Sequence, residues 1–162
     1  MVSIEVSNEV YELLVEVARR KGKSIEEVIM ESIVRDLDPK TRIKVYLKLH
    51  EKYLKEAEEL YNRRDLVQAG EKYWGALISL LNIVGEKEGL PHYTHRDLRD
   101  IVEFLAMKEN GAEYSRLSSS AEALHVNFYH KIMTKLSFEA HRSDIIKLIR
   151  KIRRFLGELV SP

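Results

Sequence analysis

Apolar side chains recur along most of this chain at spacings of three and four residues, which is the spacing of helices that bury one face. Five such segments follow one another, in residues 40–63, 65–84, 94–110, 117–128 and 137–159. The second segment is apolar nearly all round, so we expect it at the centre of the fold. The pattern predicts an all-α protein, with an up-and-down helical bundle over residues 39–162.

Residues that can begin helices stand between these segments. Asp65 with Gln68, and Thr94 with Asp97, have the spacing of helix-capping pairs. The last helix is expected to begin near Ser137. Short turns between the segments predict that consecutive helices are antiparallel neighbours.

The first 38 residues follow a different pattern, and an Asp-Pro step separates them from the bundle. Residues 2–6 alternate apolar and polar side chains, which predicts a short half-buried strand. A helix that Gly22 ends comes next, and Ser24 with Glu27 suits a capping box for a second helix. A single strand has no pairing partner in its own chain. We therefore expect residues 1–38 to join copies of the protein into a homo-oligomer, at least a dimer.

Composition narrows the class of protein. The chain has 162 residues, of which 44% are apolar and 33% charged, as in a globular protein with a substantial core. It has no cysteine, which excludes disulfides and thiolate metal sites, and no apolar run of the length that crosses a membrane. No segment has the pattern of a signal peptide, so we expect a cytoplasmic protein without a membrane partner.

The strand and two helices predicted in residues 2–37 resemble the ribbon-helix-helix family, in which two chains pair their strands and present outward strand residues to the DNA major groove. Those positions here are Ser3 and Glu5, with Ser7 as a further candidate, and Ser3 and Glu5 offer guanine no donor of the Arg or Lys type. Residues 1–38 also carry nine acidic and five basic side chains, a balance that repels phosphates. Specific binding to duplex DNA is therefore not expected.

The bundle contains the segments AGEKYWGALISLL, THRDLRDIV and AEALHVNFYH in this order. Together, over roughly residues 45–158, they resemble the archaeal PaREP family. That family resembles in turn the wider HEPN superfamily of helical bundles, in which some members are ribonucleases and others are partners of minimal nucleotidyltransferases. The resemblance implies a HEPN-like bundle whose ligand is a nucleotide or an RNA end.

HEPN nucleases share an arginine followed, after four to six residues, by a histidine. No arginine of this sequence meets that spacing, since eight residues separate Arg116 from His125 and seven separate Arg42 from His50. We therefore predict no catalytic residue and no cofactor, and we favour a non-catalytic binding or assembly protein. The alternatives are a metal-independent ribonuclease that uses His125 or His95 with Arg96 or Arg116, and a DNA-binding regulator that uses the N-terminal segment.

Polar side chains share one face of the fourth bundle helix, namely those of Ser118, Glu122, His125 and Tyr129. A histidine beside a carboxylate can act as a general acid or base, with Asn127 as a hydrogen-bonding group. The same side chains could instead cap helices and tie the bundle together. Glu122, His125, Asn127 and Tyr129 are our candidate ligand-binding residues on this helix.

His95 and Arg96 complete the candidate ligand site. Together with Arg99 they fall at the start of the third bundle helix, where free backbone N–H groups favour anions such as phosphate. In the alternative interpretation Asp97 only caps the helix and Arg96 pairs with a carboxylate. If the third and fourth helices are antiparallel neighbours, His95 and Arg96 approach His125 and Asn127.

Two spacings bear on metal binding. Glu122 and His125 have the Glu-x-x-His spacing of two-metal bundle sites, but such sites need a second copy of the motif that this sequence lacks. His92 and His95 could hold zinc only with ligands from elsewhere. No metal site is predicted.

For Trp74 and for the basic residues of the last helix, the sequence is compatible with either a structural role or a binding role. Trp74 is expected in the core, unless it lines a groove where a base could stack on it. The basic residues between positions 147 and 154 form one face of the last helix. A solvated surface is the favoured interpretation, and contact with nucleic acid is the alternative.

Overall fold

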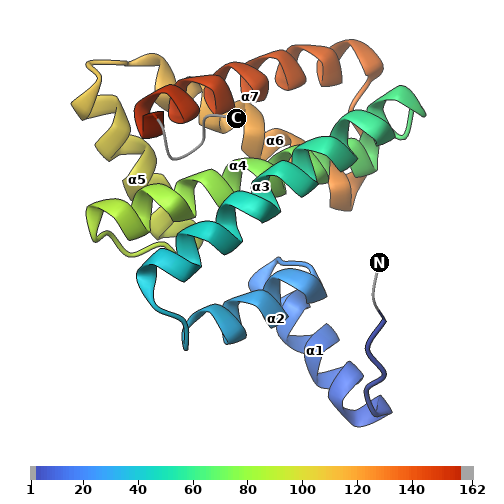
Figure 1. The fold of residues 1–162 in the computed structure, drawn as a ribbon. Helices are drawn as coiled ribbons and strands as arrows, with labels where there is room; N and C mark the ends of the chain where they lie inside the picture. Colours follow the sequence, from blue (N-terminus) through green and yellow to red (C-terminus); the bar gives the residue numbers. More distant parts are fainter. Residues whose placement is uncertain (1–2, 158–162) are drawn as a thin grey trace. The chain divides into compact units, whose positions relative to one another are not determined.

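The structure is a computed structural model that describes residues 3–157. The chain forms two compact units, Met1–Asp38 and Pro39–Pro162, which are described separately. Every regular element among the described residues is a helix, so the predicted all-α class is confirmed (Figure 1). The helices are α1 (Asn8–Lys21), α2 (Ile25–Val34), α3 (Pro39–Asn62), α4 (Leu66–Glu88), α5 (His95–Lys108), α6 (Glu113–His130) and α7 (Lys135–Leu156).

The two helices of the first unit each begin at a serine. The Ser7 hydroxyl accepts the N–H of Val10 at the start of α1, and Ser24 forms the predicted capping box with Glu27 at the start of α2. Gly22 ends α1 in the left-handed conformation, with φ at 61°, a region that glycine enters without steric cost. Local sequence signals therefore position both helices correctly.

The predicted strand at residues 2–6 is wrong for the residues that the structure describes. Residues 3–6 belong to no strand, and Val2 lies outside the described residues. A strand exists through hydrogen bonds to a second strand, and the described part of this chain provides none. Ile4 and Val6, which the alternation places on a buried face, are instead exposed.

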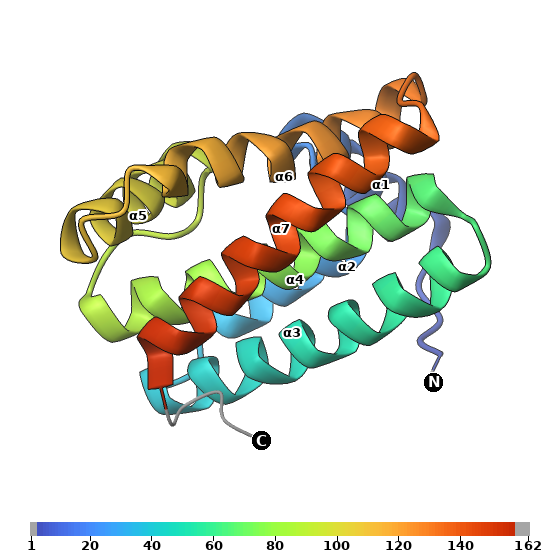
Figure 2. The same cartoon turned by 90° about the horizontal axis from the view of Figure 1, so that it is seen from above.

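The second unit is a helical bundle with α4 as its central helix. α4 packs on α3, α5, α6 and α7, and Figure 2 shows it between α3 on one side and α6 and α7 on the other. Most of its residues from Ala69 to Gly85 are buried, which agrees with its nearly uniform apolar character. α7 begins slightly before the expected Ser137, because the Thr134 hydroxyl accepts the Ser137 N–H and caps the helix. No described helix is both long enough and apolar enough to span a membrane.

A polar cluster joins α3, α4 and α7 beside the apolar core. Arg142 of α7 donates to both carboxylate oxygens of Glu58, at 3.0 and 2.9 Å, and to the Tyr73 hydroxyl at 2.6 Å. Its guanidinium carbon lies 3.8 Å from the ring centroid of Tyr61, whose hydroxyl donates to Glu139 at 3.0 Å. Burial, together with the hydrogen bond that its hydroxyl donates to Glu58, raises the pKa of Tyr73. We call these five residues the Arg142 cluster.

The loop between α4 and α5 packs directly against Gly85. A Cβ atom at this glycine would lie 2.6 Å from Nδ1 of the buried His92 and 2.8 Å from its Cβ. Nδ1 of His92 also lies 2.9 Å from the carbonyl oxygen of Leu90, while Nε2 lies 3.0 Å from a carboxylate oxygen of Glu86 that pairs with Arg42. The absent side chain at Gly85 thus makes room for the loop.

His50 of α3 is completely buried, and each of its two ring nitrogens contacts a polar group of another helix. Its Nδ1 lies 2.9 Å from the carbonyl oxygen of Ala76, and its Nε2 lies 3.2 Å from a guanidinium nitrogen of Arg153. A carbonyl only accepts and a guanidinium only donates, so His50 is neutral with its proton on Nδ1. Burial lowers the pKa of His50, and the charge of Arg153 acts in the same direction, against the Ala76 carbonyl and Glu51.

We expect the bundle to lose stability as the pH falls below about 6.5, the ordinary pKa of histidine. Between that pH and the lowered pKa of folded His50, the unfolded chain binds more protons than the folded chain, so acidification favours unfolding. Denaturant unfolding between about pH 5 and pH 8 measures the effect. His50→Asn is the comparison, since asparagine keeps a donor without titrating. An equally steep pH dependence in this variant would contradict the assignment to His50.

Candidate ligand-binding groove

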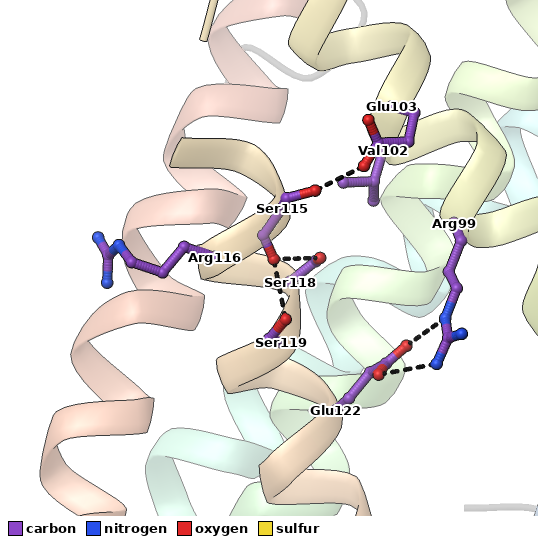
Figure 3. A pocket seen from close by; sticks show the side chains of 8 residues that line it. All are labelled: Arg99, Val102, Glu103, Ser115, Arg116, Ser118, Ser119 and Glu122. Atoms are coloured by element: carbon purple, nitrogen blue, oxygen red, sulfur yellow. Dashed lines mark hydrogen bonds and ion pairs between the residues drawn. The ribbon is translucent and has the colours of Figure 1, made fainter. Parts of the chain in front are cut away.

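A groove of about 350 Å³ separates α5 from α6 (Figure 3). Side chains of both helices line it: Arg99, Val102, Glu103, Ser115, Arg116, Ser118, Ser119 and Glu122. A narrower hollow shares several of these residues and continues to Trp74 of α4 and to His95 at the start of α5. The groove therefore has walls from α5 and α6 and reaches the central helix at one end.

Three rings meet at that end. The indole of Trp74, which is 6% exposed, is stacked with His125 of α6 at a centroid distance of 4.9 Å and with His95 at 6.0 Å. The two imidazole centroids are 5.9 Å apart. Rings on opposite faces of the indole would lie much farther from each other, so both imidazoles are on the same side of Trp74. The structure thus brings His95 and His125 together, as the antiparallel arrangement predicts.

A carboxylate of the central helix orients His125. Nδ1 of His125 lies 2.8 Å from a carboxylate oxygen of Glu71, so this nitrogen carries a proton. Nε2 is the nitrogen left for a ligand, and it accepts when the ring is neutral and donates when the ring is protonated. Tyr129, which is exposed, meets the His125 ring edge-on at 5.5 Å. We call Trp74, His95, His125, Glu71 and Tyr129 the Trp74 cluster.

The predicted capping box positions the first turn of α5. The Thr94 hydroxyl accepts the N–H of Asp97, whose carboxylate accepts the N–H groups of Tyr93 and Thr94 at 3.0 and 2.9 Å. Burial opposes ionisation of Asp97, but these hydrogen bonds outweigh it and lower the pKa of the carboxyl group. Thr94 is thus the N-cap and Asp97 completes the capping box, while His95 and Arg96 are exposed. Arg96 takes part in none of the ion pairs found among residues 3–157.

Residues 45–149, which include all of α4, α5 and α6 and parts of α3 and α7, match the model of the archaeal PaREP1/PaREP8 family. The chain belongs to this family. The matched region contains the whole groove and the Trp74 cluster, and it begins after the unit formed by residues 1–38. Neither the curated proteins nor the solved structures contain a match to the chain.

In this PaREP1/PaREP8 protein, Glu122 bridges the two walls of the groove. Its carboxylate accepts from Nε and Nη2 of Arg99, at 3.1 and 3.2 Å, in the bidentate pair drawn in Figure 3. The sequence pattern places Arg99 with His95 at the start of α5, but it does not single out Glu71. Arg99 lies one turn after His95 in α5, whereas Glu71 approaches His125 only through the packing of α4 on α6, which local spacing does not specify.

Asn127 and Arg116 lie outside the Trp74 cluster of the PaREP1/PaREP8 protein. The Oδ1 of buried Asn127 accepts the N–H of Met133 at 2.9 Å, which ties down the turn between α6 and α7. Arg116 pairs with Asp144 of α7 at 3.0 Å, and Figure 3 shows its guanidinium pointing away from Arg99. Hydrogen bonds from Ser120 and Arg116 lower the pKa of Asp144. Both Asn127 and Arg116 thus have structural partners.

The side chains considered for metal binding have other contacts in the PaREP1/PaREP8 bundle. Glu122 pairs with Arg99, and His92 faces the Leu90 carbonyl and Glu86. Among residues 3–157 there is no group of three or more histidine, aspartate or glutamate side chains placed to hold a metal ion.

Part of the basic face of α7 braces the PaREP1/PaREP8 bundle. Lys147 and Lys151 pair with Glu113 at the start of α6, at 2.6 and 2.9 Å. These two hydrogen bonds lower the pKa of Glu113 to about 2. Arg153 lies against His50, while Arg150 is exposed. Most of this face therefore has partners within the bundle.

Proposed function

We propose that this protein is a non-catalytic binding and assembly protein whose HEPN-like bundle holds the phosphate-bearing end of a nucleotide or RNA. The Trp74 cluster carries the proposal, because two imidazoles share one face of a buried indole and the exposed Arg96 follows His95 in α5. The chain belongs to the PaREP1/PaREP8 family, and the resemblance of that family to the HEPN superfamily supports a HEPN-like function. The missing Arg-x4–6-His spacing favours binding over cleavage.

Each part of the cluster suits a part of such a ligand. The exposed rings of His95 and Tyr129 can stack on a base, and base–aromatic stacking contributes ~1–3 kcal/mol per base. Arg96 and Nε2 of His125 can donate to phosphate oxygens, beside a first helical turn whose backbone N–H groups favour anions. The serine hydroxyls farther along the groove can bind a sugar.

A metal-independent ribonuclease is the second candidate, and the Glu71–His125 pair beside a second imidazole favours it. In that reaction Nε2 of His125 takes the proton of an RNA 2′-hydroxyl as its oxygen attacks the adjacent phosphorus. Protonated His95 gives a proton to the departing 5′-oxygen, which leaves a 2′,3′-cyclic phosphate. We place this candidate second because the HEPN nuclease spacing is absent.

We expect Arg96→Ala and His125→Ala each to weaken the binding of nucleotides and short 5′-phosphorylated RNAs at least tenfold. Each substitution removes a charge-assisted contact, which contributes ~1.5–3 kcal/mol. Titration calorimetry near pH 6, where histidine can be protonated, measures the loss.

Arg150→Ala is the matched control, because Arg150 is an exposed arginine of α7, and α7 does not line the groove. Equal affinity of the Arg96 and His125 variants and the parent protein would contradict the proposed site. Incubation of RNA with the protein and excess chelator separates the two candidates. Cleavage that His125→Ala abolishes would establish the nuclease and refute the non-catalytic assignment.

For residues 1–38 we propose self-association through α1 and α2, of the ribbon-helix-helix type that their order resembles. Many large apolar side chains of this unit are exposed: Ile4, Val6, Val10, Tyr11, Leu13, Val15 and Ile33. Among its described residues Ala18, Val28 and Val34 are the buried ones. A unit this small with so much apolar surface in water is typical of a subunit interface.

We expect Leu13→Glu to raise the dissociation constant of a homodimer at least tenfold. Leu13 is 61% exposed in the single chain, so the substitution leaves the fold intact and places a charge in the interface. Sedimentation equilibrium on the full chain measures the constant, with Glu12→Gln, an exposed polar position of α1, as the control. A parent protein that is monomeric at micromolar concentration would rule out the assembly.

A further inference from the structure

The turn between α6 and α7 carries an apolar pocket that the proposed function does not use. The pocket has a volume of about 360 Å³ and is lined by Ala123, Val126, Asn127, Ile132, Met133, Thr134 and Ser137. Large apolar side chains in and next to it are exposed, with Ile132 at 81% and Leu136 at 85%. Neighbouring apolar side chains left in water on a soluble domain indicate an interaction surface.

The turn that forms this pocket is held in one shape. Lys131 ends α6 in the left-handed conformation, with φ at 52°, which costs a non-glycine residue roughly 1 kcal/mol. Asn127 accepts the Met133 N–H, and Thr134 accepts the Ser137 N–H to begin α7. A fixed turn loses little conformational entropy when a partner binds. It also gives the buried Asn127, which lies outside the Trp74 cluster, a role at this second surface.

The rim of the pocket is positively charged. Residues 123–138 contain no acidic side chain, while His130, Lys131 and Lys135 are exposed there. None of these three takes part in an ion pair within the described part of the chain. Arg64, in the turn between α3 and α4, lines a neighbouring pocket together with Lys135 and with Glu139, whose carboxylate accepts from the Tyr61 hydroxyl. This combination is complementary to a partner that is both apolar and acidic.

We propose that the α6–α7 turn docks an acidic amphipathic helix of a partner protein. Apolar side chains one turn apart on that helix enter the pocket beside Ile132 and Met133, and flanking carboxylates meet Lys131 and Lys135. The pocket favours side chains of a protein over a membrane, because lipid insertion would use only the protruding Ile132 and Leu136 and leave the pocket of about 360 Å³ unfilled. The pocket shares no residue with the Trp74 cluster, so the two sites can fail or succeed independently.

A fluorescent helical peptide with leucine at positions i, i+3, i+4 and i+7 and glutamate on both flanks tests the proposal with the full-length protein. We expect saturable binding that weakens as salt rises, and at least tenfold weaker binding of the same peptide with lysine in place of glutamate. Ile132→Glu and Lys135→Glu should each weaken binding of the acidic peptide at least tenfold. Met107→Glu, at an exposed apolar residue of α5, should leave it unchanged.

Absence of binding by the acidic peptide, or equal binding by the Ile132→Glu variant, would overturn the proposal. Binding to vesicles that contain phosphatidylserine, without binding to the peptide, would also overturn it and assign the surface to a membrane. If the protein does not bind the peptide but self-associates, and Ile132→Glu abolishes this self-association, the proposal would be wrong and the surface would bind a second copy of the chain.

Discussion

Replacing Arg142 with alanine is expected to lower the free energy of unfolding by about 3 kcal/mol. The substitution removes the hydrogen bonds to Glu58 and Tyr73 and the contact of the guanidinium with the Tyr61 ring. Charge-assisted hydrogen bonds contribute ~1.5–3 kcal/mol, and a cation–π contact adds ~0.5–2 kcal/mol. Because Glu58 is partly exposed, water replaces some of the lost hydrogen bonding and keeps the total near 3 kcal/mol.

Urea denaturation of two further variants isolates the cause of this loss. Arg150→Ala changes an exposed arginine of the same helix and should shift the free energy of unfolding by less than ~0.5 kcal/mol. Arg142→Lys keeps the charge without the planar donor fork, so it should recover less than half of the loss. If the Arg142→Ala and Arg150→Ala variants were equally stable, the Arg142 cluster would not stabilise the bundle.

Gly85→Ala is expected to lower the free energy of unfolding by about 2 kcal/mol, although alanine is the better helix former. The new methyl group would lie within 2.8 Å of the His92 ring and Cβ, so the loop before α5 must move. Overpacking of a core costs ~1–3 kcal/mol, while the helix preference for alanine over glycine returns at most ~1 kcal/mol. Thermal or urea denaturation measures the difference.

Gly70→Ala, in the same helix, is the control for this prediction. A methyl group at Gly70 would lie 3.4 Å from the Phe138 ring and 3.5 Å from Leu124, which are ordinary contact distances. The substitution should therefore be neutral or stabilise the protein by up to ~1 kcal/mol. If Gly85→Ala and Gly70→Ala changed the free energy of unfolding by the same amount in the same direction, the loop before α5 would accommodate the methyl group and the prediction would be wrong.

Local features of this protein follow from the sequence. The capping pairs at Thr94 and Asp97 and at Ser24 and Glu27 form as predicted, because each involves backbone and side-chain groups only three residues apart. The central position of α4 follows from its apolar residues, which lie on nearly all sides of the helix and must therefore be covered on all sides. The meeting of His95 and His125 follows from the antiparallel order of α5 and α6.

Features that depend on distant partners do not follow from local pattern. The alternation in residues 2–6 predicts a strand, yet alternation specifies a face and not the second strand that a ladder needs. Asn127 lies two residues from His125, but the helical rotation between them turns it toward Met133. Glu71 is close to His125 only because α4 and α6 pack together, a contact that helical spacing along either helix does not contain.

The peripheral position of α5 makes its local unfolding sensitive to ligand. This helix, of 14 residues, packs mainly on α4 and α6, whereas α4 is enclosed by four helices. Elements with few buried contacts open at lower free energy than the global transition, so amide hydrogens of α5 should exchange with solvent before those of α4. A ligand that contacts both the first turn of α5 and α6 binds only while α5 is folded against α6, so it slows this exchange by mass action. Hydrogen exchange in α5 is therefore a direct report on occupancy of the groove, independent of any activity.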